Sequence, residues 1–248
     1  IQLRNQGIIL GEDSEKMSKS RGNVVSPDEL VSRYGADTVR AYLMFFARWE
    51  MGAPWNSSGI EGSVRWLRRT WSLFTESGRA GSPDAQVLRR LRRKVHQTLR
   101  QVTHDFETFE FNTIISGLME LMNEMYRARE QGAWGSAEWN EAADIYLRML
   151  APVAPHIAEE LWARQGKPYS IHTRAWPQVD EEAAAEDVIT LVVQVNGKVR
   201  DRINVPVGIS EEDARQQALA SEAVQKALDG KQPRKVILVP GRLVNVVV

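Results

Sequence analysis

Residues 7–35 read GIILGEDSEKMSKSRGNVVSPDELVSRYG, and this stretch decides the fold of the N-terminal region. The apolar run 7–10 is typical of a short strand, and the polar stretch 11–23 is typical of a loop. Ser26 can cap a helix that follows the loop, and Gly35 is a natural stop for that helix. The sequence therefore predicts a strand, a lysine-bearing loop and a helix, in that order.

Two lysines stand three residues apart in the loop, within the pentapeptide Lys16-Met17-Ser18-Lys19-Ser20. An ammonium group is a compact charge on a flexible stem, so such a pair suits a clamp that follows the moving oxygens of a polyphosphate. The clamp would stabilise the charge that builds up as pyrophosphate leaves. The alternative interpretation is a basic loop that only contacts water.

The composition excludes several classes of protein. The chain has no cysteine, which excludes disulfides and thiolate zinc sites, and none of its four histidines has a second ligand at metal-binding spacing. We therefore expect no metal site. No apolar run approaches the roughly eighteen residues of a membrane helix, and no signal peptide opens the chain, so we expect a cytoplasmic protein without a membrane partner. Because the first residue is Ile1 rather than Met, we also expect a piece of a longer protein.

Basic side chains are concentrated in one part of a chain whose formal net charge is zero. Between Arg65 and Arg100, nine arginines and one lysine stand against two carboxylates, a net of +8, whereas acidic residues gather at 180–187. Such segregation is compatible with RNA binding on one face, although basic helices are more often solvated surface.

Residues 56–175 have the 3.6-residue period of helices and predict an α-helical bundle. From Leu88 to Phe106, apolar residues recur at spacings of three and four, which indicates a helix with a core-facing stripe. A basic flank runs beside that stripe. We predict RNA contacts at its arginines, Arg89, Arg92, Arg93 and Arg100.

The acidic, alanine-rich stretch 176–187 is interpreted as a linker, after which the period changes to two. Asn196-Gly197 predicts a tight hairpin, because both central residues of such a turn need positive φ. A second hairpin near the C-terminus is separated from the first by two short helices. Residues 188–248 therefore predict a small ββααββ domain of the α+β class, with its helices on one face of the sheet.

Three basic residues alternate along the strand after the first hairpin. Lys198, Arg200 and Arg202 would project from one face of that strand, where the backbone of an RNA could lie. The turn itself is interpreted only as a turn.

The pentapeptide at 16–20 is KMSKS, the second signature of class I aminoacyl-tRNA synthetases, and its place between a strand and a capped helix resembles their catalytic domain. Further runs resemble the leucyl-tRNA synthetase family in order and spacing: YGADTVRAY, APWNSSGIEG, FNTIISGLMEL, LAPVAPHIAEELW, VVQVNGKVRDRINVP and RKVILVPGRLVNVVV. The resemblance covers essentially the whole chain. Its early runs have looser counterparts in the valyl and isoleucyl enzymes, whereas the C-terminal ββααββ unit resembles the appendage of bacterial-type leucyl enzymes.

This resemblance implies a multidomain α and α+β protein. Residues 1–55 would form the C-terminal edge of a Rossmann-type catalytic domain, 56–175 a bundle like an anticodon-binding domain, and 188–248 a tRNA-binding domain. The substrates would be leucine, ATP with Mg²⁺, and tRNA(Leu), whose shape rather than anticodon this family is understood to recognise. The residues implied to bind ATP are Lys16, Met17, Ser18, Lys19 and Ser20, of which Lys16 and Lys19 would be catalytic.

Other parts of such an enzyme are missing from the sequence. None of the histidines stands in the H-x-G-H type loop of this class, and the leucine pocket and the editing domain are absent too. Upstream catalytic and editing domains would be partners, and the chain alone should be inactive. Two alternatives stay open: a class I synthetase for valine or isoleucine, and a non-catalytic tRNA-binding module.

Overall fold

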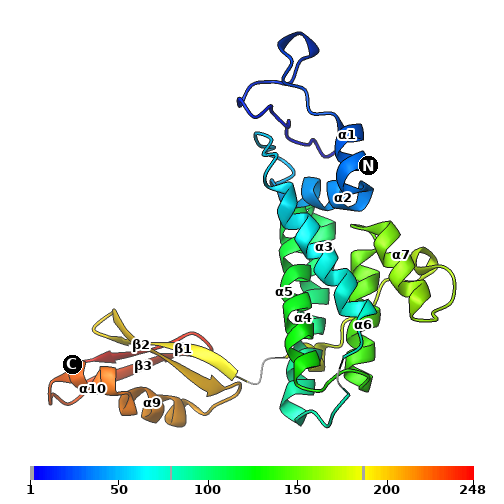
Figure 1. Cartoon of the computed structure of the whole chain (residues 1–248). Coiled ribbons are helices and arrows are strands. Elements are labelled where there is room, and N and C mark those ends of the chain that lie inside the picture. The colour runs from blue at the N-terminus through cyan, green and yellow to red at the C-terminus, as the bar shows by residue number, and fades with distance from the viewer. Residues whose placement is uncertain (1–2, 79, 186–187) are drawn as a thin grey trace. The chain divides into compact units, whose positions relative to one another are not determined.

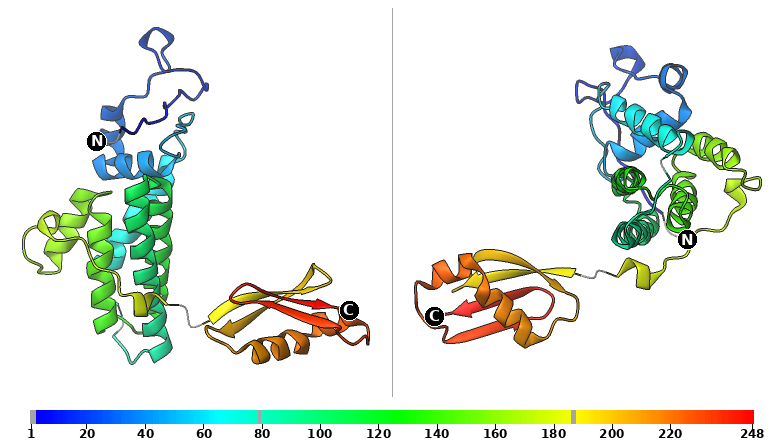
Figure 2. Two further views of the ribbon diagram at one scale, coloured as in Figure 1. Left: turned by 180° about the vertical axis from the view of Figure 1, so that it is seen from behind. Right: turned by 60° about the horizontal axis from the view of Figure 1, so that its bottom comes forward.

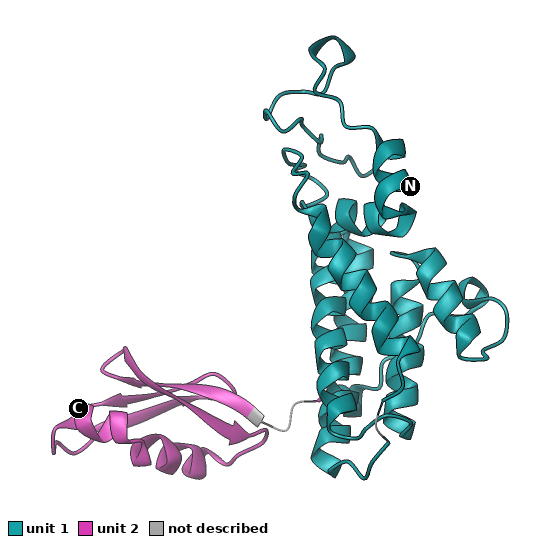
Figure 3. Ribbon diagram, in the orientation of Figure 1, with its two compact units in different colours: residues 1–184 teal, residues 185–248 magenta. Residues whose placement is uncertain are grey.

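A computed structural model describes residues 3–78, 80–185 and 188–248 of the chain. It separates into two compact units, residues 1–184 and residues 185–248, which are coloured separately in Figure 3. The first unit therefore contains both the lysine loop and the helical region. The finer division into a catalytic edge and a bundle stays a prediction.

The first unit is a helical bundle that carries two further helices and the lysine loop at one end (Figure 1). Helices α3 to α6 lie side by side in all views, and their contacts build one continuous core (Figure 2). The predicted stripe is buried on α4, where Leu91, Val95 and Leu99 are inaccessible to solvent. The elements are η1 Lys19–Arg21, α1 Pro27–Tyr34, α2 Ala36–Phe45, α3 Ile60–Thr75, α4 Ala85–Thr108, α5 Phe111–Glu130, α6 Ala137–Leu150, α7 Pro155–Arg164, η2 Ile171–Thr173 and α8 Glu181–Ala184.

Helix α1 begins and ends where the sequence predicts. Gly35, at its C-terminus, has a φ of 86°, which a residue with a side chain rarely adopts. The predicted side-chain cap is absent, because the Ser26 hydroxyl makes no capping hydrogen bond. The backbone of Ser26 closes the first turn instead, its carbonyl accepting from the Leu30 nitrogen at 3.5 Å.

Helix α2 belongs to two apolar cores at once. Ala41 lies in the core of the bundle, whereas Val39 and Tyr42 pack with Trp55 and Ile60 in a smaller cluster next to the lysine loop. Because one helix contributes to both cores, the loop segment and the bundle are packed as one unit.

The predicted linker differs from what the structure shows. Residues 176–184, which we call the strap, pack along the bundle: the Trp176 indole nitrogen donates to the Thr103 hydroxyl at 2.8 Å, and Ala184 is buried. The strap docks because its acidic side chains face the basic flank of α4, a complementarity that composition alone does not reveal. Residues 186–187 of the predicted linker lie outside the described residues.

The second unit is a four-stranded sheet with two helices packed on one face. The strand order is β2-β1-β4-β3, in which β1 and β4 are parallel and the other neighbours antiparallel. Asn196 and Gly197 have φ of 50° and 77°, as the predicted hairpin requires. The elements follow the predicted ββααββ order: β1 Val188–Val195, β2 Lys198–Pro206, α9 Glu211–Ala220, α10 Glu222–Leu228, β3 Lys235–Val239 and β4 Leu243–Val247.

Helices that could span a membrane are not found among the described residues, since none is both long enough and apolar enough.

Candidate phosphate-binding loop and nucleic-acid interface

At the base of the lysine loop, two segments of the chain, residues 7–10 and 49–53, lie in close backbone contact. The Leu10 nitrogen donates to the Ala53 carbonyl at 3.1 Å, and the Gly7 nitrogen donates to the Trp49 carbonyl at 2.7 Å. A Cβ added at Gly7 would lie 2.0 Å from the nitrogen of Gly52, so this approach requires glycine. The predicted strand at 7–10 is reduced to isolated bridges at Leu10, because its neighbour here is a bent segment.

Asn23 holds the loop in shape by bonding to both of its arms. Its Oδ1 accepts from the Ser18 nitrogen at 2.8 Å, and its Nδ2 donates to Asp13 Oδ2 at 3.0 Å. Asp13 also accepts from the Glu15 backbone nitrogen at 3.0 Å. The Glu15 bond, followed by the Asn23 bond, lowers the pKa of the Asp13 carboxyl from its usual value. The loop is thus closed by a charged hydrogen-bond network at its base.

Met17 attaches the loop to the apolar cluster beneath it. Its half-buried side chain packs on the cluster of Val39, Tyr42, Trp55 and Ile60. It also lines an apolar cavity of about 190 Å³ there. Met17, which stands between Lys16 and Lys19 in the sequence, therefore points inward and fixes the position of the loop.

Lys16 and Lys19 are both exposed on this fixed loop. Within residues 3–78, 80–185 and 188–248, neither lysine makes a side-chain hydrogen bond or ion pair. The third basic residue of the loop is engaged, because Arg21 pairs with Glu15 at 3.1 Å. Two unneutralised ammonium groups next to the paired hydroxyls of Ser18 and Ser20, 2.8 Å apart, can bind an anion.

Sequence reasoning missed the roles of Asn23, Asp13 and Glu12. Glu12 Oε1 accepts from the Ser57 nitrogen at 3.0 Å, and the hydrogen bonds with Ser57 lower the Glu12 pKa. An asparagine directly after Gly22 was a possible signal for a loop-closing side chain. Its partners could not be inferred from spacing.

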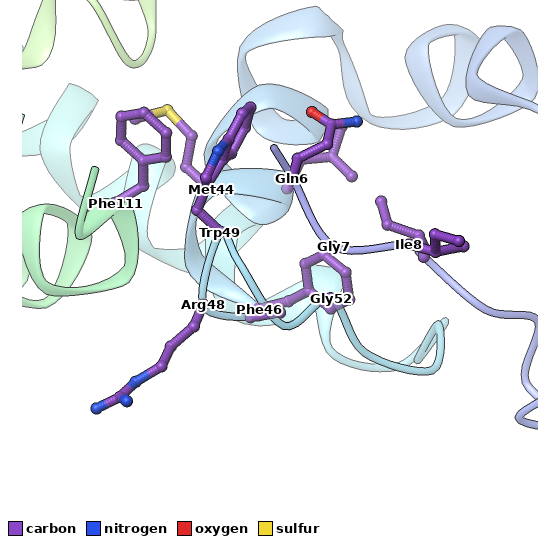
Figure 4. Close-up of a pocket in the computed structure, with 12 residues that line it drawn as sticks. Gln6, Gly7, Ile8, Met44, Phe46, Arg48, Trp49, Gly52 and Phe111 are labelled. Carbon is purple, nitrogen blue, oxygen red and sulfur yellow. The ribbon is translucent and has the colours of Figure 1, made fainter. Parts of the chain in front are cut away.

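A separate cavity of about 470 Å³ lies beside the base of the loop, and neither Lys16 nor Lys19 lines it. Figure 4 shows Trp49, Phe111 and Met44 gathered on one side of it, with the Arg48 side chain directed away. The lining is mainly apolar, so this cavity is not the phosphate-binding part of the region.

The basic flank of α4 is partly neutralised within the chain. Arg92 pairs with Glu141 at 2.8 Å and with Asp180 of the strap at 2.7 Å. Arg100 pairs with Glu181 at 2.9 Å. Arg89 is exposed and Arg93 is half-buried. Arg92 and Arg100, both predicted to contact RNA, therefore already have carboxylate partners.

The predicted basic face of β2 is wrong in its geometry. Val193 pairs with Asp201 and Gln194 with Val199, so Arg200 is the extra residue of a bulge. Lys198 pairs with the buried Val195 on the helix-covered side, whereas Arg202 pairs with Val192 on the other side. The bulge breaks the alternation, and the three side chains do not share one face.

Metal-binding clusters are likewise not seen in the part of the chain that the structure describes: no group of three or more His, Cys, Asp or Glu side chains could hold an ion.

Two family models match this chain. Residues 2–51 match tRNA synthetases class I (I, L, M and V), the segment that contains the lysine loop. Residues 89–215 match the anticodon-binding domain of tRNA ligase, which covers the basic flank of α4 and strand β2.

The curated relatives that match this chain include several leucine–tRNA ligases. A leucine–tRNA ligase from Deinococcus radiodurans is 53% identical over 246 residues, which is 99% of this chain. The chain belongs to the leucine–tRNA ligase family. A second member of that family, from Dehalococcoides mccartyi, is 51% identical over 247 residues. The chain spans 30% of the length of each of these two leucine–tRNA ligases.

A solved structure of a LeuRS agrees with this assignment. A LeuRS from Agrobacterium radiobacter K84, in a ternary complex with tRNA and LeuAMS, superposes with a TM-score of 0.85 at 32% identity. The match covers 98% of this chain and 33% of that one. A Mycobacterium tuberculosis methionyl-tRNA synthetase in complex with methionyl-adenylate shares the fold, with a TM-score of 0.53 over 66% of this chain at 19% identity.

Proposed function

We propose that this chain supplies the phosphate clamp and tRNA-binding surfaces of a leucine–tRNA ligase. The observation that carries the proposal is the lysine loop: Lys16 and Lys19 are exposed and have no partner among the described residues, while Met17 and Asn23 fix the backbone. A loop held at its base, with two free ammonium groups, can meet a polyphosphate without first breaking internal ion pairs.

In the proposed reaction the carboxylate of leucine attacks the α-phosphate of ATP, the bond to the β-phosphate breaks, and pyrophosphate leaves. Lys16 and Lys19 stabilise the negative charge that moves onto the leaving oxygens, and Ser18 and Ser20 offer hydroxyl donors. Mg²⁺ neutralises phosphate charge when it is bound with ATP. The described residues provide no cluster of ligands for this ion, so phosphates and upstream domains would hold it.

The organisation that we propose has residues 1–55 at the edge of a Rossmann-type catalytic domain and 56–175 as the bundle. Upstream catalytic and editing domains complete the enzyme, which we place in the cytoplasm. Residues 188–248 bind tRNA(Leu), as Lys198, Arg200 and Arg202 are all exposed. A second, separate set of tRNA contacts is proposed on α4 at Arg89, Arg92, Arg93 and Arg100, of which Arg92 and Arg100 take part only if they exchange their carboxylate partners for phosphates.

Titration of the chain with a leucine tRNA transcript tests the binding role. Recognition through phosphates predicts that affinity falls roughly a hundredfold between about 50 and about 200 mM salt if some four phosphates are neutralised. Exchange of the anticodon should leave affinity nearly unchanged, because phosphate contacts carry no sequence information. Abolition of binding by the anticodon exchange would show that the bundle reads the anticodon.

A further inference from the structure

A groove lies where four helices of the first unit meet. It has a volume of about 290 Å³ and is lined by side chains from α1, α2, α3 and α7, with Leu67 and Ile157 among its apolar residues. Figure 1 shows these helices meeting at the end of the bundle that carries α1. The helix that follows the lysine loop thus forms one wall of the groove.

The groove carries positive charge without acidic side chains. Arg33 from α1 and Arg68 from α3 line it, and none of its lining residues is acidic. Both arginines are exposed. Over the described part of the chain, Arg68 makes no hydrogen bond or ion pair. A ligand with negative charge therefore meets two guanidinium groups and no repulsive carboxylate in the groove.

Two guanidinium groups here lie on aromatic rings. The Arg33 Cζ is 4.9 Å from the centre of the Tyr34 ring, and the Arg164 Cζ is 5.0 Å from that of Trp71. A guanidinium stacked in this way keeps its donor edge free and loses little further freedom when it binds a phosphate. Arg164 also pairs with Glu160 at 2.8 Å, so it contributes less net charge than Arg33.

We infer that this groove binds the sugar–phosphate backbone of RNA. Arg33 and Arg68 contact phosphates, and the ring edges of Tyr34 and Trp71 contact sugar or base. The inference rests on the proposed tRNA binding by this chain. It assigns a contact site outside the basic flank of α4 and outside strand β2. RNA is favoured over an acidic protein segment because planar donors and aromatic rings stand together in one groove.

The test compares charge reversals in the full chain, using a leucine tRNA transcript and fluorescence anisotropy. Arg33→Glu with Arg68→Glu should weaken binding at least about tenfold. The matched control is Arg65→Glu with Arg69→Glu, which changes the net charge equally at two exposed arginines of α3 that do not line the groove. Circular dichroism checks that both double variants are folded.

Ultraviolet crosslinking followed by mass spectrometry gives a second measurement that needs no variant. Nucleotides crosslinked to peptides containing Tyr34 or Trp71 support the inference. The inference is overturned if the Arg33→Glu/Arg68→Glu variant binds RNA as the wild type does, or if the control variant weakens binding equally. It is also overturned if poly-glutamate, but not RNA, binds in the groove. If only Lys198→Glu/Arg200→Glu/Arg202→Glu weakens binding, the proposed function stands without this groove. If the wild-type chain does not bind the transcript, both fail.

Discussion

The carboxylate of Asp37 caps helix α7, since its Oδ2 accepts a hydrogen bond from the Ile157 backbone nitrogen at 2.7 Å. Asp37 is buried in α2, and the first nitrogens of a helix otherwise lack partners within that helix. Arg40, also on α2, donates to the carbonyls of Pro152 at 2.7 Å and Val153 at 3.2 Å. Helix α2, which lies next to the lysine loop, therefore holds both the turn between α6 and α7 and the first residues of α7.

Removal of this cap should destabilise the first unit. Asp37→Ala leaves the half-buried Ile157 nitrogen at the start of α7 without its acceptor, and loss of such a helix cap costs about 0.5–2 kcal/mol of unfolding free energy. Urea denaturation of the chain, followed by circular dichroism, measures the loss. The control is Asp28→Ala, an exposed acid in the first turn of α1, which should cost about 0.5 kcal/mol. Equal effects of the two substitutions would contradict the capping role.

The base of the lysine loop should not accept a side chain at its glycine contact. At Gly52, which has a φ of 63°, an added Cβ would lie 2.1 Å from the Ile8 carbonyl oxygen. Gly52→Ala should therefore destabilise the chain by more than about 1 kcal/mol. Gly62→Ala in α3 is the control: apart from the neighbouring backbone of its own helix, no atom lies within 4 Å of its added Cβ, and helix propensity predicts a gain of about 0.5–1 kcal/mol. Thermal unfolding of both variants separates a steric effect from a general intolerance of substitution.

Docking of the strap should weaken in acid. The pKa of Asp180 is lowered, first by the hydrogen bond from the Ala183 nitrogen and then by Arg92. Because the folded pKa lies below the unfolded one, the stabilisation is present above the usual Asp pKa of about 3.9 and is lost as pH falls through the lower folded value. Hydrogen-exchange protection factors of residues 176–184 should fall over that range.

The variant Asp180→Asn should show reduced protection of the strap already at neutral pH, with little further change in acid. Ser210, in the second unit, starts helix α9, whose protection serves as the internal control. Wild-type protection of the strap in the Asp180→Asn protein would show that this carboxylate does not hold it.

Local patterns in the sequence predicted the elements and their order, but not contacts between distant segments. The period of α4 and the turn at Asn196-Gly197 are set by neighbouring residues, so both predictions are confirmed. The docking of the strap does not follow from local sequence, because Asp180 pairs with Arg92, 88 residues away. The position of Arg200 does not follow either, because a bulge depends on the pairing of two strands. The roles of Lys16 and Lys19 stay predictions, since their exposure shows availability and not a bound phosphate.

Leucine-dependent ATP–pyrophosphate exchange with Lys19→Ala is the most direct measurement of the proposed clamp. The assay uses the Deinococcus radiodurans leucine–tRNA ligase in which this chain replaces the matching 30%. Arg21→Ala is the control on the same loop, since Arg21 is paired with Glu15. The clamp predicts that Lys19→Ala lowers the exchange rate about a hundredfold or more with little change in the KM for leucine, while Arg21→Ala stays within severalfold of the unsubstituted chimera. An unchanged exchange rate in the Lys19→Ala chimera would contradict the assignment of the loop.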